Sequence, residues 1–178
     1  MLFCLTRLSR SSDLCGLDLK FRRYIPEGVT FQASNLAKQS RSTKPRSEFF
    51  FLAFQGSQRL CPVATLREYE ERTKRLRETG AQTKLFLGKV KPHNPVAPST
   101  VARWLRSMME KAGIDISVFN AHSTRGAAVT AVANTGITTE DILKAADWSS
   151  DTVFKKFYYK PTKDTKFGQT VLSKHKSN

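Results

Sequence analysis

The spacing of apolar residues changes along the chain. Val29 and Phe31 alternate with polar residues, and residues 48–54 (EFFFLAF) form an aromatic run typical of a strand. From Val63 onwards, apolar residues recur every three or four positions, as they do on amphipathic helices. The sequence therefore predicts an α+β fold that is mostly helical, with a small antiparallel sheet near the N-terminus.

One helix can be placed by its end signals. We expect it to begin at an N-cap at Ser99 and to end at Gly113, which occupies the usual place of a C-cap glycine. Trp104 and the pair Met108 and Met109 lie between these ends. We expect all three side chains to lie in the core.

The charge balance points to a polyanionic partner. The chain has 178 residues with 30 Lys and Arg against 15 acidic residues, so its formal net charge is +15. A hydrophobic share of 39% argues against a disordered tail. A globular domain with this charge is typical of nucleic-acid binding.

Metal and membrane chemistry have little support in the sequence. Cys4, Cys15 and Cys61 are an odd number and widely spaced, and they form no zinc pattern with the histidines. We expect neither a metal site nor a disulfide framework, and we expect a reducing compartment. No stretch approaches the length of a transmembrane helix.

Three short motifs in the second half carry polar groups that packing does not require. His122 and Arg125 are three residues apart at a helix start, where an anion is favoured. Taken alone, this spacing is more typical of a capping histidine and a surface arginine. Trp148 taken alone is compatible with a core residue. Tyr158 and Tyr159 lie among lysines, which suits a surface anchor, a nucleic-acid contact or a nucleophile of lowered pKa.

The order of these motifs resembles the tyrosine recombinase (phage integrase) family. RSSDL, LAKQSR, HSTRG, DWSS and KKFYYKP follow one another with the spacing of that catalytic domain. The amino-acid sequence from KPHNPVAP onwards is most similar to recombinases of eukaryotic mobile elements of the Crypton, DIRS or Ngaro type. The resemblance implies a catalytic domain over residues 1–160 and a basic tail over residues 161–178. The family usually carries a core-binding domain before the catalytic one, and because Arg10 is close to the N-terminus we expect that domain to be absent here.

What the resemblance implies is cleavage and rejoining of DNA through a 3′-phosphotyrosyl intermediate, with no cofactor. Arg10 and Arg125 would hold the phosphate and Trp148 would donate to it, while Asp13 would orient Arg10. Lys38 would protonate the leaving oxygen. His122 would assist proton transfer from the nucleophile Tyr158. Further DNA contacts are expected from five basic residues: Arg41, Lys44, Arg46, Lys155 and Lys156.

Several alternatives stay open. The commonest family spacing places the nucleophile at Phe157, which cannot attack. Tyr158 is the next residue and is the expected nucleophile, and Tyr159 is the alternative. The same chemistry could relax DNA as a type IB topoisomerase does, and a decayed or truncated domain would only bind DNA. A basic RNA-binding or ribosomal-type protein would not require the ordered set of motifs. We expect a nuclear location, double-stranded DNA as partner and a homo-oligomer, the synaptic tetramer of the family.

Overall fold

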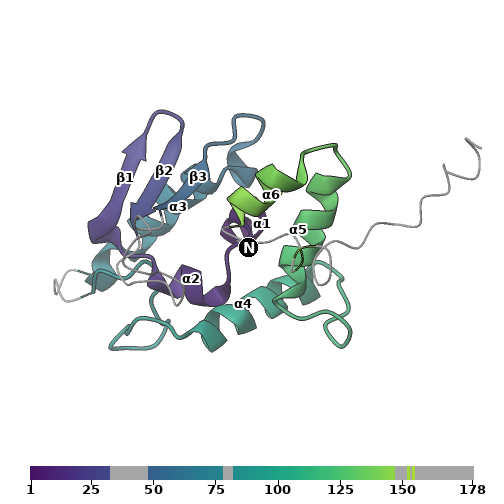
Figure 1. The fold of residues 1–178 in the computed structure, drawn as a ribbon. Helices are drawn as coiled ribbons and strands as arrows, with labels where there is room; N and C mark the ends of the chain where they lie inside the picture. Colours follow the sequence, from purple (N-terminus) through teal and green to yellow (C-terminus); the bar gives the residue numbers. More distant parts are fainter. Residues whose placement is uncertain (33–47, 78–81, 147–151, 153, 155–178) are drawn as a thin grey trace, which may run out of the picture. The chain divides into compact units, whose positions relative to one another are not determined.

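A computed structural model of the protein describes residues 1–32, 48–77, 82–146, 152 and 154 (Figure 1). The chain divides into two compact units, residues 1–128 and residues 129–178, and the division falls inside helix α5 (Ser123–Ala133). The described residues form helices and one antiparallel sheet, which confirms the α+β fold class. None of their helices is long and apolar enough to cross a membrane.

The first unit contains the sheet. Strand β1 (Arg22–Ile25) pairs antiparallel with β2 (Gly28–Gln32), and β2 pairs antiparallel with β3 (Glu48–Leu52). Figure 1 shows β2 in the middle. The predicted sheet is confirmed, and Val29, Phe31 and Phe51 are fully buried. Thr30, between Val29 and Phe31, is buried too, so β2 is covered on both faces at this point.

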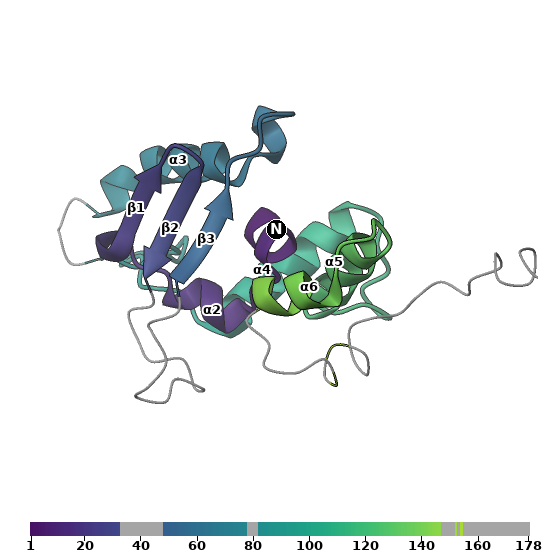
Figure 2. The same cartoon turned by 45° about the horizontal axis from the view of Figure 1, so that its top comes forward.

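Helices cover this sheet and complete the core. Helix α3 (Pro62–Thr73) packs against the sheet (Figure 2), and α1 (Leu2–Arg7) contacts β3. The ring of Phe3 stacks on that of Phe51 with centroids 4.0 Å apart. This aromatic contact holds the N-terminal segment, and with it the chain leading to Arg10, against the sheet.

Helix α4 (Pro98–Lys111) differs from the prediction in two details. It begins at Pro98 with Ala97 as N-cap rather than at Ser99, because the fixed φ of proline suits the first helical position. Met109 is 2% exposed and joins the buried stripe, whereas Met108 is 50% exposed, so the prediction that both are core residues is wrong for Met108. Trp104 is partly buried and packs against the core.

Two left-handed residues end helices. The first is Gly113, which follows α4 with a φ of 76°, so the predicted C-cap glycine is confirmed. The second is Leu8, which follows α1 with a φ of 54°. Its turn leads the chain from α1 into α2 (Ser11–Gly16), which packs against α4 (Figure 1).

The second unit is described through residue 146 and at residues 152 and 154. It holds the end of α5 and helix α6 (Thr139–Ala145). The hydroxyl of Thr138 accepts a hydrogen bond from the backbone N–H of Asp141 and caps α6. Ile142 is buried on this helix.

Short helical turns complete the described elements: η1 (Leu19–Phe21), η2 (Gln58–Leu60) and η3 (Lys74–Arg77).

Candidate active site

Arg10 stands at the start of α2 and is exposed. Its backbone N–H donates to the carboxylate of Asp13, with a distance of 2.7 Å between N and Oδ2. A carboxylate one turn into a helix satisfies an N–H that the helix leaves open. The described contact of Asp13 is therefore with the main chain of Arg10. A role of Asp13 in orienting Arg10 remains a prediction.

His122 and Arg125 lie at the start of α5, which Asn120 holds in place. The Asn120 Oδ1 accepts from the backbone N–H groups of His122 and Ser123 at 2.9 and 3.2 Å. The Ser123 hydroxyl accepts in return from the backbone N–H of Asn120 at 3.1 Å. This reciprocal pair satisfies N–H groups at the helix start and sets the direction in which the first turn leaves the loop.

These segments of the first unit surround one cavity of about 300 Å³, which we call the arginine cavity. Arg125 in its wall is 2% exposed. The described residues that line the cavity carry three guanidinium groups and one imidazole and include no carboxylate. They are Ser9, Arg10, Ser11, Ala102, Leu105, Arg106, Asn120, Ala121, His122 and Arg125.

The positive charge of this cavity acts on His122. Partial desolvation lowers the pKa of His122 below its usual value of 6.5, and the charges of Arg125 and Arg10 lower the pKa further. The imidazole is therefore held in its neutral form at neutral pH, in which one ring nitrogen can accept a proton. A cavity that opposes a further positive charge also favours an anion.

The sequence as a whole matches the model of the phage integrase family over residues 1–164. The chain belongs to the phage integrase family. No curated protein matches the sequence.

The fold of this integrase-family chain is similar to that of a solved protein described as XerA recombinase. The TM-score is 0.64 with 17% sequence identity, over 99% of this chain and 56% of that chain. The chain therefore spans just over half the length of that recombinase. At this level of identity the likeness shows a shared fold.

Of the predicted catalytic set, the structure brings Arg10, His122 and Arg125 to one cavity. Asp13 is described at the start of α2, and the other predicted site residues lie outside the described residues. They are Lys38, Arg41, Lys44, Arg46, Trp148, Lys155, Lys156, Tyr158 and the alternative Tyr159.

Four polar residues of the arginine cavity were missed by the sequence analysis: Ser9, Ser11, Arg106 and Asn120. Arg106 could have been found from helical spacing, because it shares a face of α4 with Ala102 and Leu105. Asn120 could have been recognised as a capping residue two positions before His122. Ser9 carries no such pattern.

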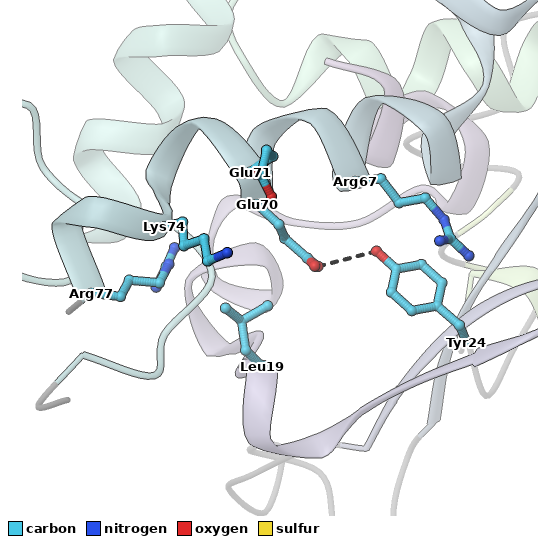
Figure 3. Close-up of a pocket in the computed structure, with 7 residues that line it drawn as sticks. All are labelled: Leu19, Tyr24, Arg67, Glu70, Glu71, Lys74 and Arg77. Carbon is cyan, nitrogen blue, oxygen red and sulfur yellow. Dashed lines mark hydrogen bonds between the residues drawn. The ribbon is translucent and has the colours of Figure 1, made fainter.

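A second cavity of the same unit, of about 500 Å³, lies between β1 and α3 (Figure 3). We call it the tyrosine cavity. Its lining residues carry both signs of charge: Leu19, Tyr24, Arg67, Glu70, Glu71, Lys74 and Arg77.

Several polar groups of the tyrosine cavity have partners within the fold. Glu70 pairs with Arg22 and accepts from the Tyr24 hydroxyl at 3.2 Å. The guanidinium of Arg67 lies 4.2 Å from the centroid of the Tyr24 ring. Arg77 donates to the carbonyl oxygens of Lys84 and Leu85 at 2.5 and 2.6 Å. These contacts join β1, α3 and the segment after α3.

The described residues contain no group of three or more His, Cys, Asp or Glu side chains that could hold a metal ion.

Proposed function

We propose that this chain cleaves and rejoins DNA strands as a tyrosine recombinase, with Tyr158 as nucleophile. The observation that carries the proposal is the arginine cavity, which places Arg10, His122 and Arg125 around one space without a lining carboxylate. Guanidinium forks match the oxygens of a phosphodiester, so a DNA phosphate is the anion that this cavity fits best. Membership of the phage integrase family supports the same reading.

The proposed reaction is a transesterification. The Tyr158 oxygen attacks phosphorus and the bond from phosphorus to the 5′-oxygen breaks, which leaves a 3′-phosphotyrosyl link. The tyrosine proton passes to neutral His122, and Lys38 gives a proton to the leaving 5′-oxygen. Rejoining reverses these steps.

Charge that develops on the non-bridging oxygens would be stabilised by fixed donors around the phosphate. Arg10 and Arg125 would each supply a planar fork, and Trp148 would supply one indole N–H. Asp13 would act through Arg10, since its carboxylate holds the backbone N–H of that residue. Basic residues outside the described part would extend the contact along the DNA backbone: Arg41, Lys44, Arg46, Lys155 and Lys156.

The finer part of the proposal concerns context. The sequence resemblance to Crypton, DIRS or Ngaro recombinases supports a role in the recombination or integration of a eukaryotic mobile element. Double-stranded DNA would then be the partner, the nucleus the location and a synaptic homo-oligomer the working form. A chain that only binds DNA is the second candidate, which the net charge of +15 favours equally.

Covalent trapping separates the two candidates. The purified chain is incubated with nicked and supercoiled DNA of mixed sequence, alongside Tyr158→Phe and Tyr159→Phe. We expect detergent-resistant adducts with the parent chain and Tyr159→Phe, and none with Tyr158→Phe. Adducts lost only in Tyr159→Phe would assign the nucleophile to Tyr159. Salt-sensitive binding without any adduct would favour the binding-only candidate.

A further inference from the structure

Arg106 is the third arginine of the arginine cavity. It lies on the same face of α4 as Ala102 and Leu105, which also line this cavity. Arg103, three residues earlier on the same helix, is exposed and is not among the lining residues. The helix therefore offers two exposed arginines of equal charge, of which one reaches the candidate active site.

The Arg106 guanidinium is anchored and still has donors available. Its Nη2 donates to the carbonyl oxygen of Ile116 at 3.2 Å, in the segment between α4 and α5. Within the described residues Arg106 has no other hydrogen-bond acceptor and no carboxylate partner. A guanidinium carries five N–H donors, so most of them can point to a ligand.

Asn120 supplies a neutral donor in the same cavity. Its Oδ1 accepts from two backbone N–H groups of the α5 start, which fixes the orientation of the amide. The Nδ2 group has no acceptor among the described residues, and Asn120 is one of the residues that line the cavity. A cation and an amide donor together suit a phosphate oxygen.

The cavity has room for more than the reacting phosphate. Its 300 Å³ correspond to about ten water molecules at roughly 30 Å³ each, which exceeds the space of one phosphate group. Arg10 and Arg125 suffice to hold a single phosphate through two forks. Arg106 is therefore an additional positive charge in a space larger than that phosphate.

We propose that Arg106, assisted by Asn120, binds the DNA phosphate next to the one held by Arg10 and Arg125. This inference rests on the proposed function, because it assumes that DNA occupies the cavity. Arg106 is then a positioning residue: it fixes the register of the strand and contributes affinity that does not depend on base sequence. The chemical step itself does not use it.

Salt dependence of binding tests this contact. The affinity of the full chain for a short mixed-sequence duplex is measured at several salt concentrations for the parent chain, Arg106→Gln and Arg106→Lys. We expect Arg106→Gln to weaken binding about tenfold. We expect it to reduce the slope of log K against log salt by about 1, since one phosphate contact is lost. Arg106→Lys, which keeps the charge, restores most of that slope.

Arg103→Gln is the matched control, because it removes the same charge from the same helix outside the cavity. We expect it to change affinity and slope less than Arg106→Gln does. Thermal unfolding of all variants checks that the Ile116 contact is not needed for folding. Equal slopes for Arg103→Gln and Arg106→Gln, or an unchanged slope for Arg106→Gln, would overturn the inference.

The rate of adduct formation at saturating DNA separates this inference from the proposed function. We expect the loss in Arg106→Gln to be confined to affinity, so that the saturated rate stays near that of the parent chain. A saturated rate that falls by a hundredfold or more would place Arg106 on the reacting phosphate instead and overturn the positioning role. Absence of adducts in every variant would contradict the proposed function, while the salt slopes would still decide the role of Arg106.

Discussion

The arginine cavity and the tyrosine cavity use similar residue types in opposite ways. In the tyrosine cavity, the Glu70 carboxylate accepts from the Tyr24 hydroxyl (Figure 3). Glu70 also pairs with Arg22, which lies outside the lining. In the arginine cavity, three arginines and His122 line a space without a lining carboxylate. A cavity whose lining carries both signs of charge has no preference for an anion, whereas one lined by a single sign of charge is suited to bind one.

The largest expected effect comes from removing a phosphate-binding group of the arginine cavity. Arg10→Ala should lower the rate of adduct formation by about 10²- to 10³-fold, as for the loss of one fixed oxyanion donor. Arg10 is exposed, so its removal should leave thermal stability nearly unchanged. Single-turnover trapping and thermal unfolding measure the two effects.

Arg67→Ala is the corresponding change in the tyrosine cavity. Arg67 is also exposed, and its guanidinium packs on the Tyr24 ring. We expect its adduct rate to equal that of the parent chain. An equal loss of rate in both variants would mean that general positive charge, rather than the arginine cavity, governs the reaction.

Glu70→Ala should have the opposite effect to Arg10→Ala: it should lower stability and leave the adduct rate unchanged. This change leaves two partly buried partners, Arg22 and Tyr24, without their acceptor and should lower the free energy of unfolding by about 1–3 kcal/mol. Denaturant unfolding measures the loss, and the adduct rate of folded protein should not change. Glu71→Ala, in the same cavity but exposed and without an ion pair among the described residues, should have little effect.

Glu70→Ala should also change the titration of Tyr24. Burial and then the charge of Glu70 raise the pKa of Tyr24 to about 12. Loss of the carboxylate should lower this pKa toward 10, which ultraviolet absorbance detects. In the parent chain this raised pKa contributes stability that is present below pH 10 and is lost as pH rises from 10 through 12. A phenol that titrates identically in both proteins would contradict the described contact.

A smaller effect is expected from pH on the arginine cavity. The pKa of His122 is lowered, so the adduct rate under limiting DNA should fall only when pH drops below 6.5 and through that lowered pKa. Because the pKa of His122 is lower in the folded chain than in the unfolded chain, the folded chain binds this proton less readily. The free energy of unfolding should therefore decrease as pH falls from 6.5 through the lowered pKa. His122→Gln should remove both dependences. A rate that rises on acidification would rule out neutral His122 as proton acceptor.

The smallest effect concerns two buried hydroxyl groups. The Ser9 hydroxyl has no hydrogen-bond partner among the described residues, although Ser9 is only 5% exposed. Ser9→Ala should therefore change the free energy of unfolding by less than about 0.5 kcal/mol, or raise it. Thr73 next to the tyrosine cavity donates to the Tyr69 carbonyl at 2.8 Å, so Thr73→Val should cost about 1 kcal/mol. Equal costs would show that Ser9 has a partner in the folded chain.

Local sequence patterns were sufficient to predict the sheet and helix α4. They were insufficient to predict which side chains of the helix are buried. Alternation predicted the sheet because side chains on a strand must face the core at every second position, and Val29 and Phe31 do so. The end signals predicted α4, and both methionines within it were expected in the core. Only the packing of α4 decides that Met109 faces inward while Met108 stays half exposed, because the two differ by about 100° around the helix axis.

The sequence by itself determined the α+β class, the basic surface and the ordered motifs that place the chain in the phage integrase family. It identified Arg10, His122 and Arg125, because each belongs to a short motif. The tertiary structure alone decided that these residues share one cavity, and it added the polar residues Ser9, Ser11, Arg106 and Asn120 to that cavity. It also showed that the larger cavity is lined by both signs of charge and that its Glu70 binds Arg22 and Tyr24. The physical reason is that a motif fixes residues along one segment, whereas a cavity depends on how α2, α4 and the start of α5 pack together.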